Sequence, residues 1–192
     1  VETCVERDRE RKMMGRPAVG AHVIRQMAMR SGLTTFPTQS VVLCDMDGTL
    51  CDIAHRRHFV RDGNRQWDRF FAAMDKDTLR QDVWQSVQAA CAVSEQESRT
   101  LILVSARPDT YRDVTERWLA EHGVTGYYTL IMRRSDDNRP DTVVKRELLY
   151  SHFPNLAMDA PIACVFDDRP SVVRMWRTEG LTVHDVGDGE EF

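Results

Sequence analysis

Residues 41–50 read VVLCDMDGTL, an apolar run followed by two aspartates and a glycine. The uninterrupted apolar run Val41–Cys44 predicts a strand that is buried on both faces, as in a parallel sheet. Residues i and i+2 of an extended chain point the same way, so Asp45 and Asp47 should leave this strand on the same side. The stretch therefore predicts a central strand that carries two carboxylates at its carboxyl end.

Apolar runs and helical patterns alternate through much of the remaining chain. The other predicted strands are Leu101–Val104, Tyr128–Met132, Ile162–Phe166 and Leu181–Val183. The predicted helices are Asp82–Val93, Asp109–His122, Thr142–Phe153 and Ser171–Thr178. Strands that alternate with helices in this way are typical of a doubly wound α/β fold.

Two segments lie outside this alternation. Residues 51–80 are polar and aromatic and too long for a tight turn, so we expect an insertion over the site. Residues 1–37 are predicted to form a helical N-terminal segment, with a charged helix or loop at 6–14 and an amphipathic helix at Val19–Met29. Residues 38–192 are the main predicted domain, because the 192-residue chain fits one domain of about 150 residues with an appendage.

The composition excludes several classes of protein. Hydrophobic residues make up 42% and charged residues 29%, which is ordinary for a globular protein and excludes a largely disordered chain. No apolar run approaches the ~20 residues of a membrane span, so no membrane partner is expected. A net charge of −4 is unlike that of a bulk nucleic-acid binder but compatible with a small basic site. Five cysteines without a CxxC pair indicate reduced thiols, a cytoplasmic location and no zinc site.

Polar residues follow the predicted strands at their carboxyl ends, where ligands bind in such sheets. Asp167 and Asp168 follow the fourth strand, and with Asp45 and Asp47 they would converge at one rim. Carboxylates this close need their charge neutralised. A hard divalent cation with oxygen ligands does this, and Mg²⁺ is the predicted one.

An ionised aspartate can act as a nucleophile toward a phosphoester. It is ionised at neutral pH, so one residue of the Asp45–Asp47 pair can attack phosphorus while the other handles a proton. Ser105 follows the second strand and Lys145 lies early in a helix, and both can bind phosphate oxygens. Singly, each residue is explained as a turn, a helix cap or a solvated charge. Their order at successive strand ends favours catalysis.

These motifs resemble those of the haloacid dehalogenase superfamily. The match covers about residues 41–185, with residues 45–49 as the first motif, Ser105 as the second, Lys145 as the third and residues 167–168 as the fourth. The resemblance implies a three-layer, Rossmann-like α/β fold with a central, mainly parallel sheet and a small cap-like insertion. It also implies a phosphatase, because a second aspartate in the first motif is characteristic of the phosphatases of this superfamily.

The resemblance further implies roles for individual residues. Asp45 is the implied nucleophile, which forms an aspartyl-phosphate, and Asp47 is the implied general acid and then base. Mg²⁺ is implied to bind Asp45, the backbone carbonyl of Asp47, and Asp168, with Asp167 in support. The implied catalytic residues are thus Asp45, Asp47, Ser105 and Lys145.

A narrower resemblance is to the phosphatase domains of phage polynucleotide kinase-phosphatases. It rests on FDDRPSVVRMWR at residues 166–177, DTVVKRE at 141–147 and the closing segment 180–188. Residues 9–29 resemble the tail of the kinase domain in the same enzymes. One departure is Ala106, which stands where the phage enzyme has glycine. No GxxxxGK[ST] motif occurs, so the chain is not expected to phosphorylate 5′ ends.

The leading hypothesis is a Mg²⁺-dependent phosphomonoesterase that removes 3′-phosphates from nucleic-acid ends in end healing and repair, in the host cytoplasm if the protein is phage-encoded. The predicted substrate-binding residues are Arg56, Arg107, Arg169 and Thr49. A small-molecule phosphatase such as a nucleotidase remains an alternative, as does a non-catalytic fragment that docks a kinase domain or forms a homo-oligomer. The four tryptophans are predicted to pack in the core rather than to stack on a substrate.

Overall fold

The computed structural model describes residues 2–17, 24, 27, 40–61, 63, 65–93, 98–153 and 162–191. The chain divides into two units, Val1–Thr38 and Gln39–Phe192. In the first unit, α1 (Glu2–Met13) is a charged helix that ends in basic residues, which suit the negative end of a helix dipole. The amphipathic helix predicted at Val19–Met29 lies outside the described residues, apart from Ile24 and Met27.

The second unit is built on a five-stranded sheet with the order β5-β4-β1-β6-β7. Its strands are β1 (Val41–Cys44), β4 (Thr100–Pro108), β5 (Thr129–Arg133), β6 (Ile162–Asp167) and β7 (Val183–Asp185). Each neighbouring pair is parallel. All four residues of β1 are buried, as the apolar run predicted for a central strand. The predicted α/β fold with a mainly parallel sheet is confirmed.

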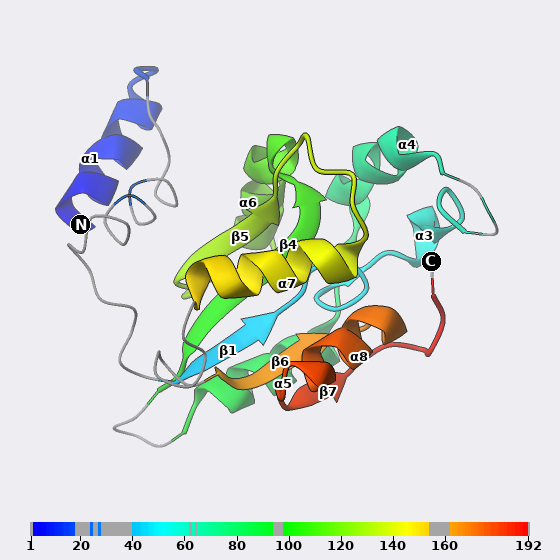
Figure 1. Ribbon diagram of the computed structural model, residues 1–192. Helices are drawn as coiled ribbons and strands as arrows, with labels where there is room; N and C mark the ends of the chain where they lie inside the picture. Colours follow the sequence, from blue (N-terminus) through cyan, green and yellow to red (C-terminus); the bar gives the residue numbers. More distant parts are fainter. Residues whose placement is uncertain are drawn as a thin grey trace. The chain divides into compact units, whose positions relative to one another are not determined.

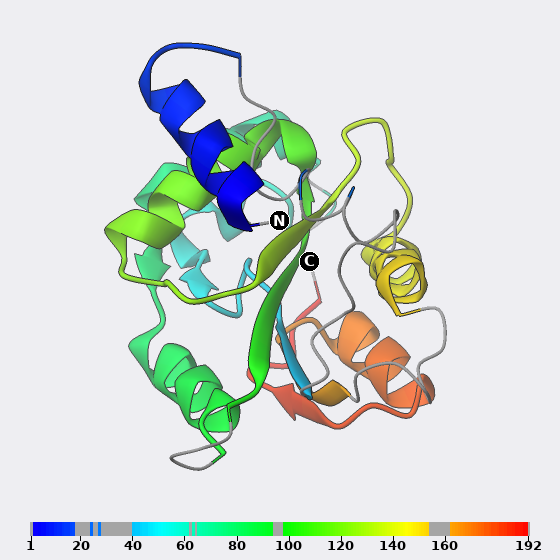
Figure 2. The same cartoon turned by 90° about the vertical axis from the view of Figure 1, so that its left-hand side faces the viewer.

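Helices cover both faces of this sheet. They are α5 (Gln81–Cys91), α6 (Arg112–Glu121), α7 (Asp141–His152) and α8 (Pro170–Thr178), and a short 3-10 helix (Asp109–Tyr111) precedes α6. Figures 1 and 2 show α5 and α6 on one face and α7 and α8 on the other, which makes three layers. No helix among the described residues is long and apolar enough to cross a membrane.

The insertion folds as a small unit beside the sheet. Its first strand, β2 (Cys51–Asp52), pairs antiparallel with its last, β3 (Thr78–Leu79). Between them lie α3 (Ala54–Arg57), α4 (Trp67–Ala72) and a 3-10 helix (Met74–Lys76). Phe70 and Met74 are buried and anchor the insertion by apolar packing. Because β2 begins three residues after Gly48, the insertion lies next to the aspartates that follow β1.

Two strands differ from their predicted bounds. β4 continues through Pro108, four residues beyond the predicted end at Val104, and its register with β5 becomes irregular between Ser105 and Pro108. β7 begins at Val183, two residues later than predicted. Because β4 is longer than predicted, Ser105 and Arg107 belong to the strand itself, and both are buried.

Candidate active site

The four predicted aspartates separate into two groups at the carboxyl end of the sheet. Asp45, Asp167 and Asp168 offer carboxylate oxygens that all lie within 4.8 Å of one another. Asp47 instead groups with Asp77 of the insertion and Cys51. β1 and β6 are adjacent parallel strands, so their first carboxylates meet, whereas the chain turns at Gly48 and directs the side chain of Asp47 toward the insertion.

Lys145 supplies the positive charge in the first group. From the first turns of α7, its Nζ lies 2.8 Å from Asp45 Oδ1 and 2.7 Å from Asp167 Oδ2. Burial alone would lower the pKa of Lys145, but Asp167 and Asp45 outweigh it and raise that pKa, so the ammonium stays protonated. Trp176 of α8 donates from Nε1 to the same Asp167 oxygen at 3.0 Å, which fixes the carboxylate.

The first group carries more negative charge than Lys145 neutralises. Burial, and then Asp167 and Asp168, raise the pKa of Asp45 well above its ordinary value, although Lys145 opposes the shift. Burial and the neighbouring Asp167 raise the pKa of Asp168 to about 6. Three carboxylates with oxygen donors at short spacing are the ligand set that Mg²⁺ prefers. The residues present therefore fit the predicted cation.

The turn after β1 holds Asp168 in place. Gly48 has φ +83, and a Cβ at this position would lie 2.0 Å from Asp168 Oδ2. Thr49 is fully buried, and its hydroxyl donates to Asp168 Oδ1 at 2.9 Å. Thr49 was predicted to bind substrate, but the structure places it behind Asp168, where it positions that carboxylate.

Gly48→Ala is expected to lower both the free energy of unfolding and the rate of the phosphatase reaction that the motifs predict. Its matched control is Gly126→Ala, because Gly126 also has a positive φ (+79) but has nothing within 4 Å of the added Cβ. The free energy of unfolding of the control should fall only by the cost of a left-handed backbone conformation in a residue with a Cβ, about 1–2 kcal/mol. Gly48→Ala should lose more, with turnover about 100-fold lower because Asp168 is displaced. Urea unfolding and steady-state assays measure both, and equal losses in the two variants would contradict the close approach.

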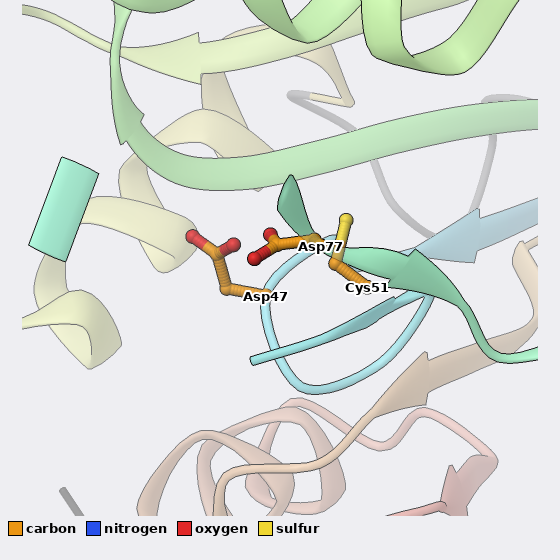
Figure 3. A group of neighbouring side chains, drawn as sticks. All are labelled: Asp47, Cys51 and Asp77. Atoms are coloured by element: carbon orange, nitrogen blue, oxygen red, sulfur yellow. The ribbon is translucent and has the colours of Figure 1, made fainter. Parts of the chain in front are cut away.

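Two arginines surround Asp47, an arrangement that we call the arginine clamp (Arg56, Arg107, Asp47 and Asp77). Arg107 Nε donates to both oxygens of Asp47 at 3.0 Å. Arg56 Nη2 lies 2.5 Å from both Asp47 and Asp77, and Arg107 Nη2 lies 3.2 Å from Asp77. In Figure 3 the carboxylate of Asp77 extends toward that of Asp47, with Cys51 beside it. The clamp thus alternates two carboxylates with two guanidinium groups.

The clamp fixes the charge of Asp47. Burial alone would raise the pKa of Asp47, but Arg107 and Arg56 outweigh it and hold that pKa well below the ordinary range. Burial also raises the pKa of the Cys51 thiol, so sulfur is a poor ligand here. The guanidinium groups of Arg56 and Arg107 already neutralise the carboxylates of Asp47 and Asp77. The group of Asp47, Cys51 and Asp77 therefore does not suit a metal ion.

A cavity of about 1220 Å³ opens over both groups. The predicted residues that line it are Asp45, Asp47, Ser105, Lys145, Asp168 and Arg169. Arg56 and Arg107 do not line it; both are fully buried behind Asp47, so the structure places these predicted substrate-binding residues in the clamp. Arg169 reaches the cavity and is 2.5 Å from Asp141, which Arg133 also contacts.

Comparison with known proteins identifies the family. Residues 39–191 match the family described as the polynucleotide kinase PNKP phosphatase domain. The chain belongs to this family. It is therefore a phosphatase of the haloacid dehalogenase superfamily, as its motifs predicted.

Individual relatives agree with this family. The phosphatase is 31% identical over 138 residues to a putative bifunctional polynucleotide kinase/RNA ligase of Autographa californica nuclear polyhedrosis virus. The matched stretch is 71% of this chain and 17% of the viral protein. It is 30% identical, with a TM-score of 0.59, to a chain in the structure of the Pnkp1/Rnl/Hen1 RNA repair complex, over 82% of this chain and 45% of that one. A second structure of the Pnkp1/Rnl/Hen1 complex matches equally, over 48% of its chain. The phosphatase thus spans less than half the length of these relatives.

Several residues of the phosphatase site were not found from the sequence. Asp77 follows a 3-10 helix in the insertion, and no motif or period marks it as the acidic centre of the arginine clamp. Asp141 lies one helical turn before Lys145 on α7, a spacing that could have indicated a shared face. Arg65, Arg133 and Arg139 line the cavity from loops and strand ends, where isolated arginines carry no distinguishing pattern.

Proposed function

We propose that this phosphatase removes 3′-phosphate groups from nucleic-acid ends, with Mg²⁺ and through an aspartyl-phosphate on Asp45. The observation that carries the proposal is the position of Asp45 in the cavity, in contact with Lys145 and beside Asp47. The reaction needs a nucleophile and a general acid–base. Asp45, which contacts the buried ammonium of Lys145, can be the first, and Asp47, which the arginine clamp fixes, can be the second.

In the proposed first step, a carboxylate oxygen of Asp45 attacks phosphorus and the bond from phosphorus to the 3′-oxygen breaks. The leaving oxygen takes a proton from Asp47. In the second step, water attacks the phosphorus of the aspartyl-phosphate, Asp47 accepts the water proton, and phosphate leaves with Asp45 regenerated. Ser105 and Lys145 line the cavity beside Asp45, where they bind the phosphate oxygens.

The acid role of Asp47 requires a proton that the arginine clamp disfavours. A phosphate dianion bound beside Asp47 adds negative charge, and a nearby like charge raises the pKa of a carboxyl group. Substrate binding thus prepares Asp47 to donate its proton, and loss of the phosphate returns it to the ionised form. This coupling makes the acid available only when the phosphate is in place.

Mg²⁺ would be held by Asp45 and Asp168, with Asp167 in support and the backbone carbonyl of Asp47 as a further ligand. When bound, it supplies positive charge that offsets the negative charge of the phosphate and the carboxylates. Removal of divalent metal with EDTA is expected to abolish phosphate release, and added Mg²⁺ to restore it. Asp168→Asn should raise the Mg²⁺ concentration needed for half-maximal activity, whereas the exposed Asp75→Asn should not. Full activity in EDTA would contradict this part of the proposal.

The proposed substrate is a polynucleotide end rather than a free nucleotide. Guanidinium groups suit phosphates, and four arginines line the cavity: Arg65, Arg133, Arg139 and Arg169. Arg133 and Arg169 pair with Asp141, and Arg139 pairs with Asp137 and Glu147. The names of the relatives, a polynucleotide kinase/RNA ligase and an RNA repair complex, support a role in healing ends before ligation, in partnership with a kinase domain.

The deciding experiment measures phosphate release from 3′-phosphorylated oligonucleotides beside nucleoside 3′- and 5′-monophosphates. We expect the highest kcat/KM for the oligonucleotides, with a KM that rises steeply with salt. A preference for free nucleotides with little salt dependence would indicate a nucleotidase instead. No release from any substrate, with formation of a stable complex with a separately expressed kinase domain, would indicate a non-catalytic docking role.

A further inference from the structure

Three aromatic rings form a row inside the candidate active-site cavity, which we call the aromatic row (Trp67, Phe71 and Tyr111). The ring centroids of Trp67 and Phe71 are 6.1 Å apart at an interplanar angle of 26°. Those of Phe71 and Tyr111 are 5.1 Å apart at 30°. The rings come from α4 and from the 3-10 helix before α6, so two distant segments build one surface.

The prediction that all four tryptophans pack in the core is wrong for Trp67. Trp118 and Trp176 are buried, but Trp67 is 41% exposed. It lines the cavity together with Phe71 and Tyr111. An indole this exposed contributes little to the core, and its position in the cavity leaves it available to another flat ring.

The aromatic row packs against a buried ring. Phe70 is buried beneath it and meets Trp67 edge to face at 5.8 Å and 85°, and Phe71 at 5.3 Å and 74°. On its other side, the guanidinium of Arg56 lies 4.1 Å from the centroid of the Phe70 ring. Arg56, which contacts Asp47 in the arginine clamp, therefore also contacts the buried ring on which the aromatic row packs.

Arginines line the same cavity as the aromatic row, together with acidic residues that include Asp68. Arg65 lies two residues before Trp67, and Arg169 lines the same cavity near Asp168. Cationic groups that follow a phosphate backbone, together with aromatic rings that stack on successive bases, are how proteins bind single-stranded nucleic acid without reading its sequence. A phosphomonoester without a nucleobase needs no aromatic surface.

We propose that the aromatic row is a base-binding subsite, on which the terminal nucleobases of a single-stranded 3′ end stack while its 3′-phosphate reaches Asp45. This rests on the proposed function and adds to it the class of end that is bound. Bases in a duplex have both faces covered by their neighbours, so a recessed end must unpair before it can stack. The subsite therefore selects single-stranded ends with little preference among bases.

The test compares two oligonucleotides that carry the same 3′-phosphate, one with normal terminal bases and one in which the last two nucleotides are abasic. For the wild-type protein, kcat/KM should be about tenfold or more higher with the bases present. In Trp67→Ala this ratio should fall toward one, and Trp67→Phe should recover most of it because a ring remains. Tyr150→Ala is the control, since Tyr150 is exposed on α7 outside the cavity, and its ratio should equal that of the wild type.

Binding to Asp45→Asn protein separates this subsite from the proposed reaction. Tryptophan fluorescence should be quenched by the base-bearing oligonucleotide and much less by the abasic one, and the difference should vanish in the Asp45→Asn, Trp67→Phe double variant. If wild-type protein releases phosphate from both oligonucleotides at equal kcat/KM, the subsite is refuted and the proposed function stands. If no phosphate is released but the quenching differs as described, the proposed function fails and the subsite stands.

Discussion

Asp45→Asn is expected to lower phosphate release from a 3′-phosphorylated oligonucleotide by ~10⁴-fold or more, the scale seen when a nucleophile is removed. Asparagine keeps the shape of the side chain but cannot attack phosphorus to form the acyl phosphate. The loss should appear in the single-turnover rate constant for bound substrate and not in substrate affinity, because the cavity still binds the substrate.

The same variant should remain folded. Asp45 lies among Asp167 and Asp168, and burial together with these charges disfavours its ionised form. A neutral side chain relieves that repulsion, so the thermal midpoint without Mg²⁺ should not fall. Asp75→Asn, at an exposed position on the 3-10 helix of the insertion, serves as the matched carboxylate control and should turn over normally. Retention of a tenth of the wild-type rate by Asp45→Asn would rule out its role as the nucleophile.

Arg107→Ala is expected to produce the largest loss of stability among single substitutions at this site. Arg107 is fully buried and bonds to both Asp47 and Asp77. Its removal leaves the partly buried Asp47 paired with Arg56, and the buried Asp77 paired with Arg56 and His55. Breaking a buried ion pair in this way costs about 3–5 kcal/mol. Denaturant unfolding measures the loss, and phosphate release should fall with it because Asp47 is no longer held.

Two further variants test this explanation. Arg107→Lys keeps the charge but not the planar fork of donors, so it should recover part of the stability and little of the activity. Arg134→Ala removes an arginine whose ion pair with Asp136 is exposed, and should change the unfolding free energy little. An Arg107→Ala protein as stable as Arg134→Ala would show that the arginine clamp does not hold the site together.

The sheet and half of the site follow from the sequence for one reason. Parallel strands end at a common edge, so Asp45, Ser105 and the Asp167–Asp168 pair were expected near one another once their strands had been identified. Lys145 follows the same reasoning, since the start of α7 lies at this edge. These expectations need only the order of elements, which apolar runs and helical periods reveal.

The other half depends on how the insertion folds. Arg56 and Arg107 were expected at the phosphate because arginine commonly binds phosphate. In the structure both contact Asp77, which lies 21 residues beyond Arg56, and both are buried behind Asp47. Trp67 was expected in the core because the spacing of the four tryptophans is typical of core packing. The helix that carries it, α4, has only six residues, and Trp67 is 41% exposed. Short helices and lone charges give no periodic signal, so their positions become known only from the structure.

The pairing of β2 with β3 makes residues 51–80 an interchangeable module. Because the module leaves and rejoins the domain at one point, its parts outside the buried core residues Ile53, Val60 and Phe70 can be lengthened or replaced at a small cost in loop-closure entropy. Among its described residues, Arg56 contacts Asp47, and Asp77 contacts Arg56 and Arg107. An exchange of this module between related phosphatases that preserves these two residues should therefore transfer the preference for one kind of end and leave the chemistry of Asp45 unchanged.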